Sequence, residues 1–316
     1  MNKTKFITLC TILFLGLLFI FPQISFESAK SGLLLWFNTV VPTLLPFLIL
    51  SNFMIYFKIT PFISKIFAPI ICPILKISKN ACYPVIIGML SGYPLGAKTC
   101  NDFVEEKLIS RKEGNDLILL CNNASPMFLT YYVSCYCLNA ESRQYIYYSI
   151  VILSSFLTFI LFRLVSSSSS ETKAVCKPTS IIQNTETNFL PFLDKAIISS
   201  AAILVKVGGY IILFSILANQ IISIPLLPLH IKSFIAAIFE LTIGTRSLSD
   251  ISVFSYQTKT ALILSLSSFG GFSALLQTKS VILSSRLSIK RYFVGKCVSA
   301  SFTYILVKLF FLLHAV

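Results

Sequence analysis

The chain has 316 residues, of which 55% are hydrophobic and 12% are charged, and its mean hydropathy is +0.83. Soluble domains carry about 25% charged residues, so this composition excludes an ordinary soluble enzyme or binding module and predicts a polytopic membrane protein. The net charge of +14 comes from cations scattered through loops between apolar runs. This pattern is typical of loops that face cytoplasm and anionic membrane lipid, not of a nucleic-acid-binding surface.

The first apolar run, residues 6–21, follows Lys3 and Lys5. It has the outline of a signal peptide, but no convincing small-residue cleavage site follows, so we expect an uncleaved helix with its amino end inside. We assign residues 1–32 to this anchor, 33–165 to a first membrane repeat and 189–316 to a second. Residues 166–188 form a polar, serine-rich linker between the repeats.

The first repeat begins with an interrupted run of span length, residues 33–57, which contains Pro42 and Pro46. Proline removes a backbone hydrogen bond, so a kink is expected, and its role is open between structure and function. Residues 60–78 contain Pro61, Pro69 and Pro73 and favour a re-entrant or short tilted segment over a full crossing.

Two polar islands then interrupt apolar sequence. The first is the turn Ser91-Gly92-Tyr93-Pro94, followed by a polar helix with Lys98, whose free N–H groups at the turn would suit an anion. The second is Cys121-Asn122-Asn123-Ala124-Ser125-Pro126, midway along the run 115–138, where Pro126 should free the carbonyl of Asn122. Irregular backbone at membrane depth is tolerated where it lines a protein-enclosed cavity. We therefore predict a wet pocket, with interhelical hydrogen bonding as the alternative role of the amides.

Similar interruptions recur after the regular span 145–165. The span 197–222 carries Lys206 near its middle, and a charge at that depth marks a transport pathway by default. The short run 231–239 ends at Glu240, and Arg246 follows. The run 260–276 is broken at Gly270 and Gly271, and Lys279 lies on a polar helix over 277–287. Residues 292–313 form the final span.

The two halves show signs of an internal duplication. An offset of 179 residues pairs Gly92 with Gly271, and it pairs the basic cluster at 111–112 with that at 290–291. Three complete crossings separate the two glycine turns, which predicts inverted repeats with re-entrant segments. Inversion on this register would place one basic cluster on the non-cytoplasmic side, against the positive-inside tendency.

The motif from Gly88 to Lys98, the island 121–126, and Glu240 with Thr242 and Gly244 together resemble the YlbJ family of sporulation integral membrane proteins, also called stage V sporulation protein V. The resemblance covers essentially the whole chain. It implies an all-α bundle with two Gate-like, or nucleoside-recognition, repeats, as in concentrative nucleoside transporters and the membrane part of ferrous-iron transporters. It also implies a multi-pass protein in the cell membrane or outer forespore membrane of a sporulating bacterium, which moves dipicolinic acid from the mother cell across the outer forespore membrane.

Dipicolinate is a dianion at neutral pH, so a route through hydrocarbon needs cations and N–H donors in a protein-lined cavity. The candidate substrate-binding residues are Ser91, Gly92, Tyr93, Lys98, Asn122, Asn123, Ser125, Lys206, Glu240, Arg246, Gly270, Gly271 and Lys279. Each cation has an alternative role as an interfacial anchor or as a partner for a nearby carboxylate. Glu240 is open between proton coupling, pairing with Arg246 and helix capping.

No residue set predicts catalysis, a metal or a cofactor. The sequence has nine cysteines without a Cys-x-x-Cys pair, two histidines, and no phosphate-binding Gly-x-x-x-x-Gly-Lys loop. We therefore expect no enzyme activity. The predicted partners are a small anionic solute and membrane lipid, with a homo-oligomer or other sporulation membrane proteins also open. The alternatives are a non-transporting scaffold for spore assembly, or a Gate-type transporter of another small solute such as a nucleoside.

Overall fold

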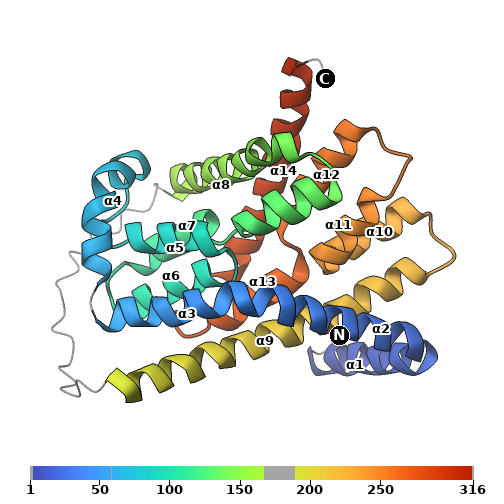
Figure 1. Ribbon diagram of the computed structural model, residues 1–316, viewed down its shortest axis with the longest axis horizontal. Coiled ribbons are helices and arrows are strands. Elements are labelled where there is room, and N and C mark those ends of the chain that lie inside the picture. The colour runs from blue at the N-terminus through green and yellow to red at the C-terminus, as the bar shows by residue number, and fades with distance from the viewer. Residues whose placement is uncertain (1–2, 58, 167–188, 315–316) are drawn as a thin grey trace.

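The computed structural model describes residues 3–57, 59–166 and 189–314, and within these ranges it contains helices and no strand (Figure 1). The predicted linker, 166–188, lies outside the described residues except for Ser166. The elements, where η marks a π- or 3-10 helix, are α1 (Lys3–Ile20), α2 (Pro22–Leu35), η1 (Trp36–Val40), α3 (Val41–Tyr56), α4 (Thr60–Leu75), α5 (Cys82–Ser91), α6 (Leu95–Glu105), α7 (Arg111–Cys121), η2 (Phe128–Cys137), η3 (Glu141–Arg143), α8 (Gln144–Ser166), α9 (Phe189–Ser223), α10 (Leu229–Phe239), α11 (Leu241–Ser249), α12 (Tyr256–Phe269), α13 (Gly271–Val281) and α14 (Ile289–His314). The predicted all-α fold is confirmed.

Several of these helices are long and apolar enough to cross a membrane. Within the described ranges four qualify by length and composition, namely Glu141–Val165, Phe189–Ser223, Tyr256–Val281 and Ile289–His314. Two bent pairs, Thr11–Ile20 with Pro22–Val40 and Leu44–Tyr56 with Thr60–Leu75, turn by 106° and 98° and would bring the number to six. The predicted multi-pass membrane protein is thus confirmed, and the proline-rich segment 60–78 forms α4, which is steeply bent away from α3.

Two long rods lie side by side along one edge of the bundle (Figure 1). One is α2, η1 and α3, in which the kink expected near Pro42 takes the form of the π-helical turn Trp36–Val40. The other is α9. The indole nitrogen of Trp36 donates a hydrogen bond to the carbonyl of Leu204 at 2.8 Å, and its ring covers Gly208. The missing side chain at Gly208 therefore lets the two rods approach closely.

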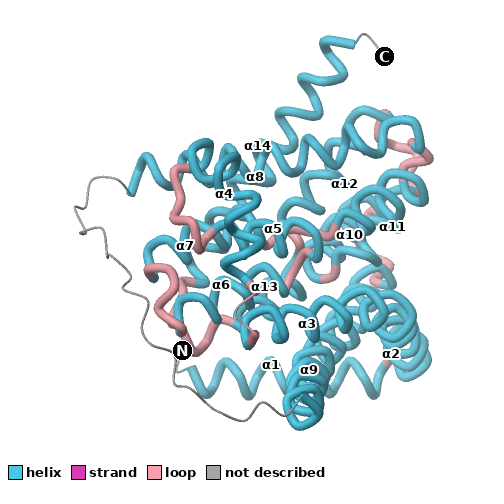
Figure 2. The backbone as a smooth tube through the Cα atoms, turned by 60° about the vertical axis from the view of Figure 1, so that its left-hand side comes forward, coloured by secondary structure: helices cyan, strands magenta, loops and turns pink. Residues whose placement is uncertain are grey.

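The remaining helices contain two helical hairpins whose turns lie in the interior. The first hairpin is α5 with α6, and the second is α10 with α11. In the first, Gly88 and Gly96 both face the carbonyl of Cys121 at the end of α7; in the second, Gly244 packs against Ala237. Figure 2 shows loop segments in the middle of the molecule beside α5, α10 and α13, where a regular bundle would have continuous helix.

A broken helical segment, here called a broken crossing, follows each hairpin, and the second of the two is long and apolar enough to span a membrane. The first is α7 with η2, interrupted at residues 122–125, and the second is α12 with α13, interrupted at Gly270. A straight helix, α8 or α14, then completes each half. The order of elements is therefore hairpin, broken crossing and straight helix in both halves.

The two hairpins enter from opposite ends of the bundle. Near the open end of the first hairpin, the Asn101 side chain on α6 bonds to Ser284 and Ser285 in the α13–α14 loop. At the open end of the second, Arg246 on α11 stacks over Tyr136 near the end of η2. These contacts support the predicted inversion, while the Gate-like nature of the repeats stays a prediction.

The register predicted for the duplication is wrong. It pairs Gly92, a hairpin turn, with Gly271, which lies at the break of a crossing. An offset of 147 residues instead pairs turn with turn, Tyr93 with Glu240 (240 − 93), and break with break, Asn123 with Gly270 (270 − 123).

The predicted separation of the two basic clusters is also wrong. Arg111 donates a side-chain hydrogen bond to the carbonyl of Arg286, and the backbone N–H of Ser288 bonds to Asn115 Oδ1 at 2.7 Å. The clusters at 111–112 and 290–291 therefore lie at the same end of the molecule. The two hairpins enter from opposite ends, but both basic clusters lie at one end. Inverted repeats are therefore consistent with the positive-inside tendency.

Candidate functional site

The turn of the first hairpin lies directly against the break in the first crossing. Gly92 has φ +79°, and a Cβ atom there would lie 2.6 Å from the backbone nitrogen of Ser125. The next residue, Tyr93, donates its backbone N–H to the carbonyl oxygen of Asn123 at 2.7 Å. Glycine is therefore required both by the backbone conformation and by the lack of space.

The interruptions of the second half meet in a similar way and touch the first set. Gly270 and Gly271 have φ +89° and +79°. A Cβ on Gly271 would lie 3.2 Å from the carbonyl oxygen of Ile238 near the end of α10, and one on Gly270 would lie 3.8 Å from Cε1 of Tyr93. The half-buried Tyr93 thus lies between the halves, and the predicted meeting of the interruptions in the interior is observed.

Asn122 joins three elements at this meeting point, and its side chain is fully buried. Its Oδ1 accepts from the backbone N–H of Ala97 on α6 at 3.2 Å, and its Nδ2 donates to Thr278 on α13 and Tyr292 on α14, each at 2.8 Å. The hydroxyl of Tyr292 donates to the backbone carbonyl of Asn122 at 3.1 Å. The carbonyl that Pro126 was predicted to free is therefore bonded by the other half of the chain.

Asn123 connects the break to a buried cation. Its Oδ1 accepts hydrogen bonds from Ser155 Oγ on α8 and from Lys296 Nζ on α14, each at 2.8 Å, and its Nδ2 donates to the carbonyl of Leu120. Lys296 is only 2% exposed. We call Asn122, Asn123, Tyr292 and Lys296 the amide hub.

Buried hydroxyl groups extend the hub between α8, α12 and α14. Ser299 Oγ lies 2.7 Å from Ser268 Oγ, 3.2 Å from Ser154 Oγ and 3.4 Å from Ser155 Oγ. Thr303 donates to Ser154 Oγ at 2.7 Å. All five side chains are buried, so a polar layer continues from the hub into the middle of the spanning helices.

The predicted site residues divide into those at the hub and those elsewhere. Gly92, Tyr93, Asn122, Asn123, Gly270 and Gly271 meet there, as shown above. Ser91 is buried at the end of α5, and its hydroxyl has no hydrogen-bond partner. Ser125 accepts from the backbone N–H of Phe128 at 3.2 Å, so its hydroxyl caps the helix that follows the break.

Three of the predicted cations lie away from the hub. Lys98 forms an ion pair with Asp102 at 2.5 Å and reaches Asn52 Oδ1 at 3.4 Å, which is the alternative role considered for it. Lys206 and Lys279 are exposed on α9 and α13, so their expected place in an interior site is wrong.

Glu240 and Arg246 do not pair with each other. The buried Glu240 carboxylate accepts from the backbone N–H of Ile243 at 2.8 Å and caps the start of α11, so the capping role is observed. Arg246 lies 3.8 Å from Asp250 and 4.5 Å from the centroid of the Tyr136 ring. Of the roles left open for Glu240, pairing with Arg246 is therefore not observed.

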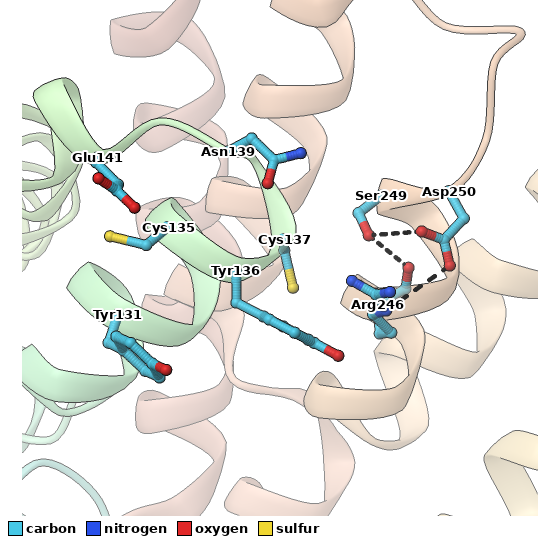
Figure 3. A pocket seen from close by; sticks show the side chains of 9 residues that line it. All are labelled: Tyr131, Cys135, Tyr136, Cys137, Asn139, Glu141, Arg246, Ser249 and Asp250. Atoms are coloured by element: carbon cyan, nitrogen blue, oxygen red, sulfur yellow. Dashed lines mark hydrogen bonds and ion pairs between the residues drawn. The ribbon is translucent and has the colours of Figure 1, made fainter.

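Arg246 lines a separate pocket of about 470 Å³ near the end of η2 and α11 (Figure 3). In this view its guanidinium group lies between the Tyr136 ring and Asp250. Glu141 and Asp250 together bring more negative charge than Arg246 offsets. The pocket is therefore not suited to a dianion. Among the described residues no group of three His, Cys, Asp or Glu side chains is placed to hold a metal ion.

Lys296 was missed from the sequence, although a signal for it exists. Tyr292, Lys296, Ser299 and Thr303 follow the spacing i, i+4, i+7, i+11 and form one polar face along the final span. Lys206 has no such stripe and lies beside the buried face of α9. A lysine within a polar stripe is a better indicator of an interior site than a lysine at the middle of a span.

Comparison with known proteins gives one relative. No protein-family model matches the chain, and no solved structure matches it. The sporulation integral membrane protein YlbJ of Bacillus subtilis (strain 168) is 27% identical over 319 aligned residues, which cover 91% of this chain and 78% of that protein. Over nearly its whole length, the chain is therefore similar to a sporulation integral membrane protein.

Proposed function

We propose that the protein acts in sporulation as a membrane transporter of a small organic anion, with dipicolinate as the first candidate. The relative supports the sporulation and membrane parts of this proposal. The resemblance of the motifs at 88–98 and 121–126 to the YlbJ family is the reason to test dipicolinate first. The amide hub is the observation that carries the transport part.

The hub combines two features of transporter sites. Broken helices from both halves bring non-helical backbone and polar side chains together in the interior, and the contacts of the two hairpins support opposite orientations of the halves. A scaffold gains nothing from interrupting four helical segments in its interior, because each interruption forfeits helical hydrogen bonds that must be replaced. A pathway needs such interruptions to hold a polar solute.

In the state seen here the hub is closed on itself. Both amides have protein partners for their oxygen and nitrogen atoms. A bound solute would have to replace some of these contacts. Three of them join the two halves, namely those of Asn122 with Thr278 and Tyr292 and that of Lys296 with Asn123. Binding is therefore coupled to the relative position of the halves, as alternating access requires.

The test is uptake of radiolabelled pyridine-2,6-dicarboxylate into liposomes that contain the purified protein. We expect the wild type to take up the anion and Asn122→Ala to lose uptake, because three hydrogen bonds to its side chain disappear. Each buried group left unpaired costs about 1–3 kcal/mol. Asn219→Ala on α9 makes the same chemical change outside the hub and should leave uptake unchanged.

The scaffold alternative makes the opposite prediction. It expects no uptake by the wild type, and it expects Asn122→Ala to support sporulation as well as the wild type when both accumulate equally in the membrane. That pair of results would overturn the transport proposal.

A further inference from the structure

Lys296 is a buried lysine to which the described residues give no counter-charge. The ion pairs among the described residues are Lys98–Asp102, Arg246–Asp250 and Arg291–Asp116, and none of them includes Lys296. Burying an ammonium group is expensive unless a carboxylate and further hydrogen bonds compensate it. The cost is tolerated at sites where a charged ligand completes the pair.

The ammonium group is also short of hydrogen-bond acceptors. It has three N–H donors. The structure shows one hydrogen bond for it, to Asn123 Oδ1 at 2.8 Å, and places it 5.8 Å from the centroid of the Tyr292 ring. A neutral amide oxygen and an aromatic ring compensate a full charge only in part.

We infer that Lys296 is the counter-charge for a carboxylate of the transported anion, and that Asn123 Oδ1 holds its ammonium group when the solute is absent. This inference rests on the proposed function, because it takes the amide hub as the binding site. Asn123 suits the holding role, since its oxygen also accepts from Ser155 and keeps that bond when the ammonium turns to a carboxylate. Thr278 and Tyr292 bond to the other amide, Asn122, and so do not compete for Asn123 Oδ1.

A single buried charge at the site should set the preference between anions of different charge. The probes are pyridine-2,6-dicarboxylate, a dianion, and pyridine-2-carboxylate, a monoanion with the same ring. In liposomes, Lys296→Met should reduce uptake of the dicarboxylate by at least about tenfold, the size of one charge-assisted hydrogen bond. It should also raise the ratio of monocarboxylate to dicarboxylate uptake, which a general packing defect would not do.

Three variants serve as controls. Lys296→Arg keeps the charge and should retain a ratio close to that of the wild type. Lys206→Met and Lys279→Met remove exposed lysines by the same substitution and should change neither rate. If Lys296→Met is not monodisperse in detergent, Lys296→Gln replaces it, because it keeps a polar group beside Asn123 without the charge.

The outcomes separate this inference from the proposal beneath it. If the wild type takes up neither anion, transport of these anions fails and this inference falls with it. In another outcome, the wild type takes up the dicarboxylate while Lys296→Met or Lys296→Gln keeps both the wild-type uptake rate and the wild-type ratio of monocarboxylate to dicarboxylate uptake. In that case transport stands and the role of Lys296 is overturned. A lowered rate with an unchanged ratio also overturns it, because it shows a structural role.

Discussion

At the scale of single residues, the site depends on a position that only glycine can occupy. Gly92 has φ +79° and ψ −167°, a backbone conformation that is essentially restricted to glycine. Its α-carbon also faces the backbone of Ser125 and the carbonyl of Asn123. The first hairpin can therefore reach the amide hub only through glycine.

Gly92→Ala should destabilise the protein and impair transport. The backbone strain alone costs about 1–3 kcal/mol, and the added methyl group must also push the turn away from the break. Thermal unfolding in detergent and uptake in liposomes measure the two effects. Gly209→Ala is the matched control, because no atom lies within 4 Å of a Cβ built there, and alanine is the better helix former. Equal melting temperatures for the two variants would contradict the prediction.

The residues of the hub were only partly predictable. The paired amides and the glycine turns stand out because polar, glycine-broken islands are rare in apolar sequence. Lys296 and Thr278 stand out less, because Lys296 is recognised only through the polar stripe that it shares with Tyr292, Ser299 and Thr303, and Thr278 is one of several neighbouring polar residues. Their role depends on which face of the helix meets Asn122 and Asn123, and that is decided by tertiary packing.

At the scale of elements, the two hairpins end differently. The first turn is built on Gly92 and lies against a break, whereas the second carries Glu240, whose carboxylate caps the start of α11. A carboxylate suits this position because the free N–H groups and the dipole at a helix start favour negative charge. Proton coupling is not needed to explain a buried acid here.

Substitution of Glu240 distinguishes a cap from a proton carrier. Glu240→Gln keeps an oxygen that can accept from Ile243, so we expect uptake within about twofold of the wild type and a small loss of stability. Glu240→Ala removes the cap and should cost about 0.5–2 kcal/mol of unfolding free energy. If the glutamine variant is stable but loses uptake, Glu240 carries a proton and the capping account is insufficient.

The type and approximate place of most elements could be read from hydrophobic runs and prolines, but their pairing could not. A register based on matching glycines placed Gly92 opposite Gly271, because glycine is a conspicuous marker in sequence. The structure pairs Tyr93 with Glu240 and Asn123 with Gly270, so equivalent positions share a backbone break but no chemistry. Similar geometry built from different residues leaves no pattern for a sequence comparison within one chain.

At the scale of the whole molecule, charge and topology agree on one orientation. The end at which the first hairpin opens holds both basic clusters, around Arg111 and Lys290, with Lys76 and Lys79 in the α4–α5 loop. The positive-inside tendency therefore places this end in the cytoplasm. The second hairpin and the loop 250–255 then face the opposite side.

This orientation can be tested by labelling introduced cysteines in intact cells with a membrane-impermeant maleimide. Glu106→Cys lies exposed between α6 and α7, and Ser252→Cys lies exposed between α11 and α12. We expect Ser252→Cys to react in intact cells and Glu106→Cys to react only after permeabilisation, each measured above the labelling of the parent protein. Reaction of both from the same side would show that the hairpins do not enter from opposite ends, and the reverse pattern would place the basic end outside. The first result would remove the arrangement on which access to the amide hub from two sides depends, whereas the second would overturn only the assigned orientation.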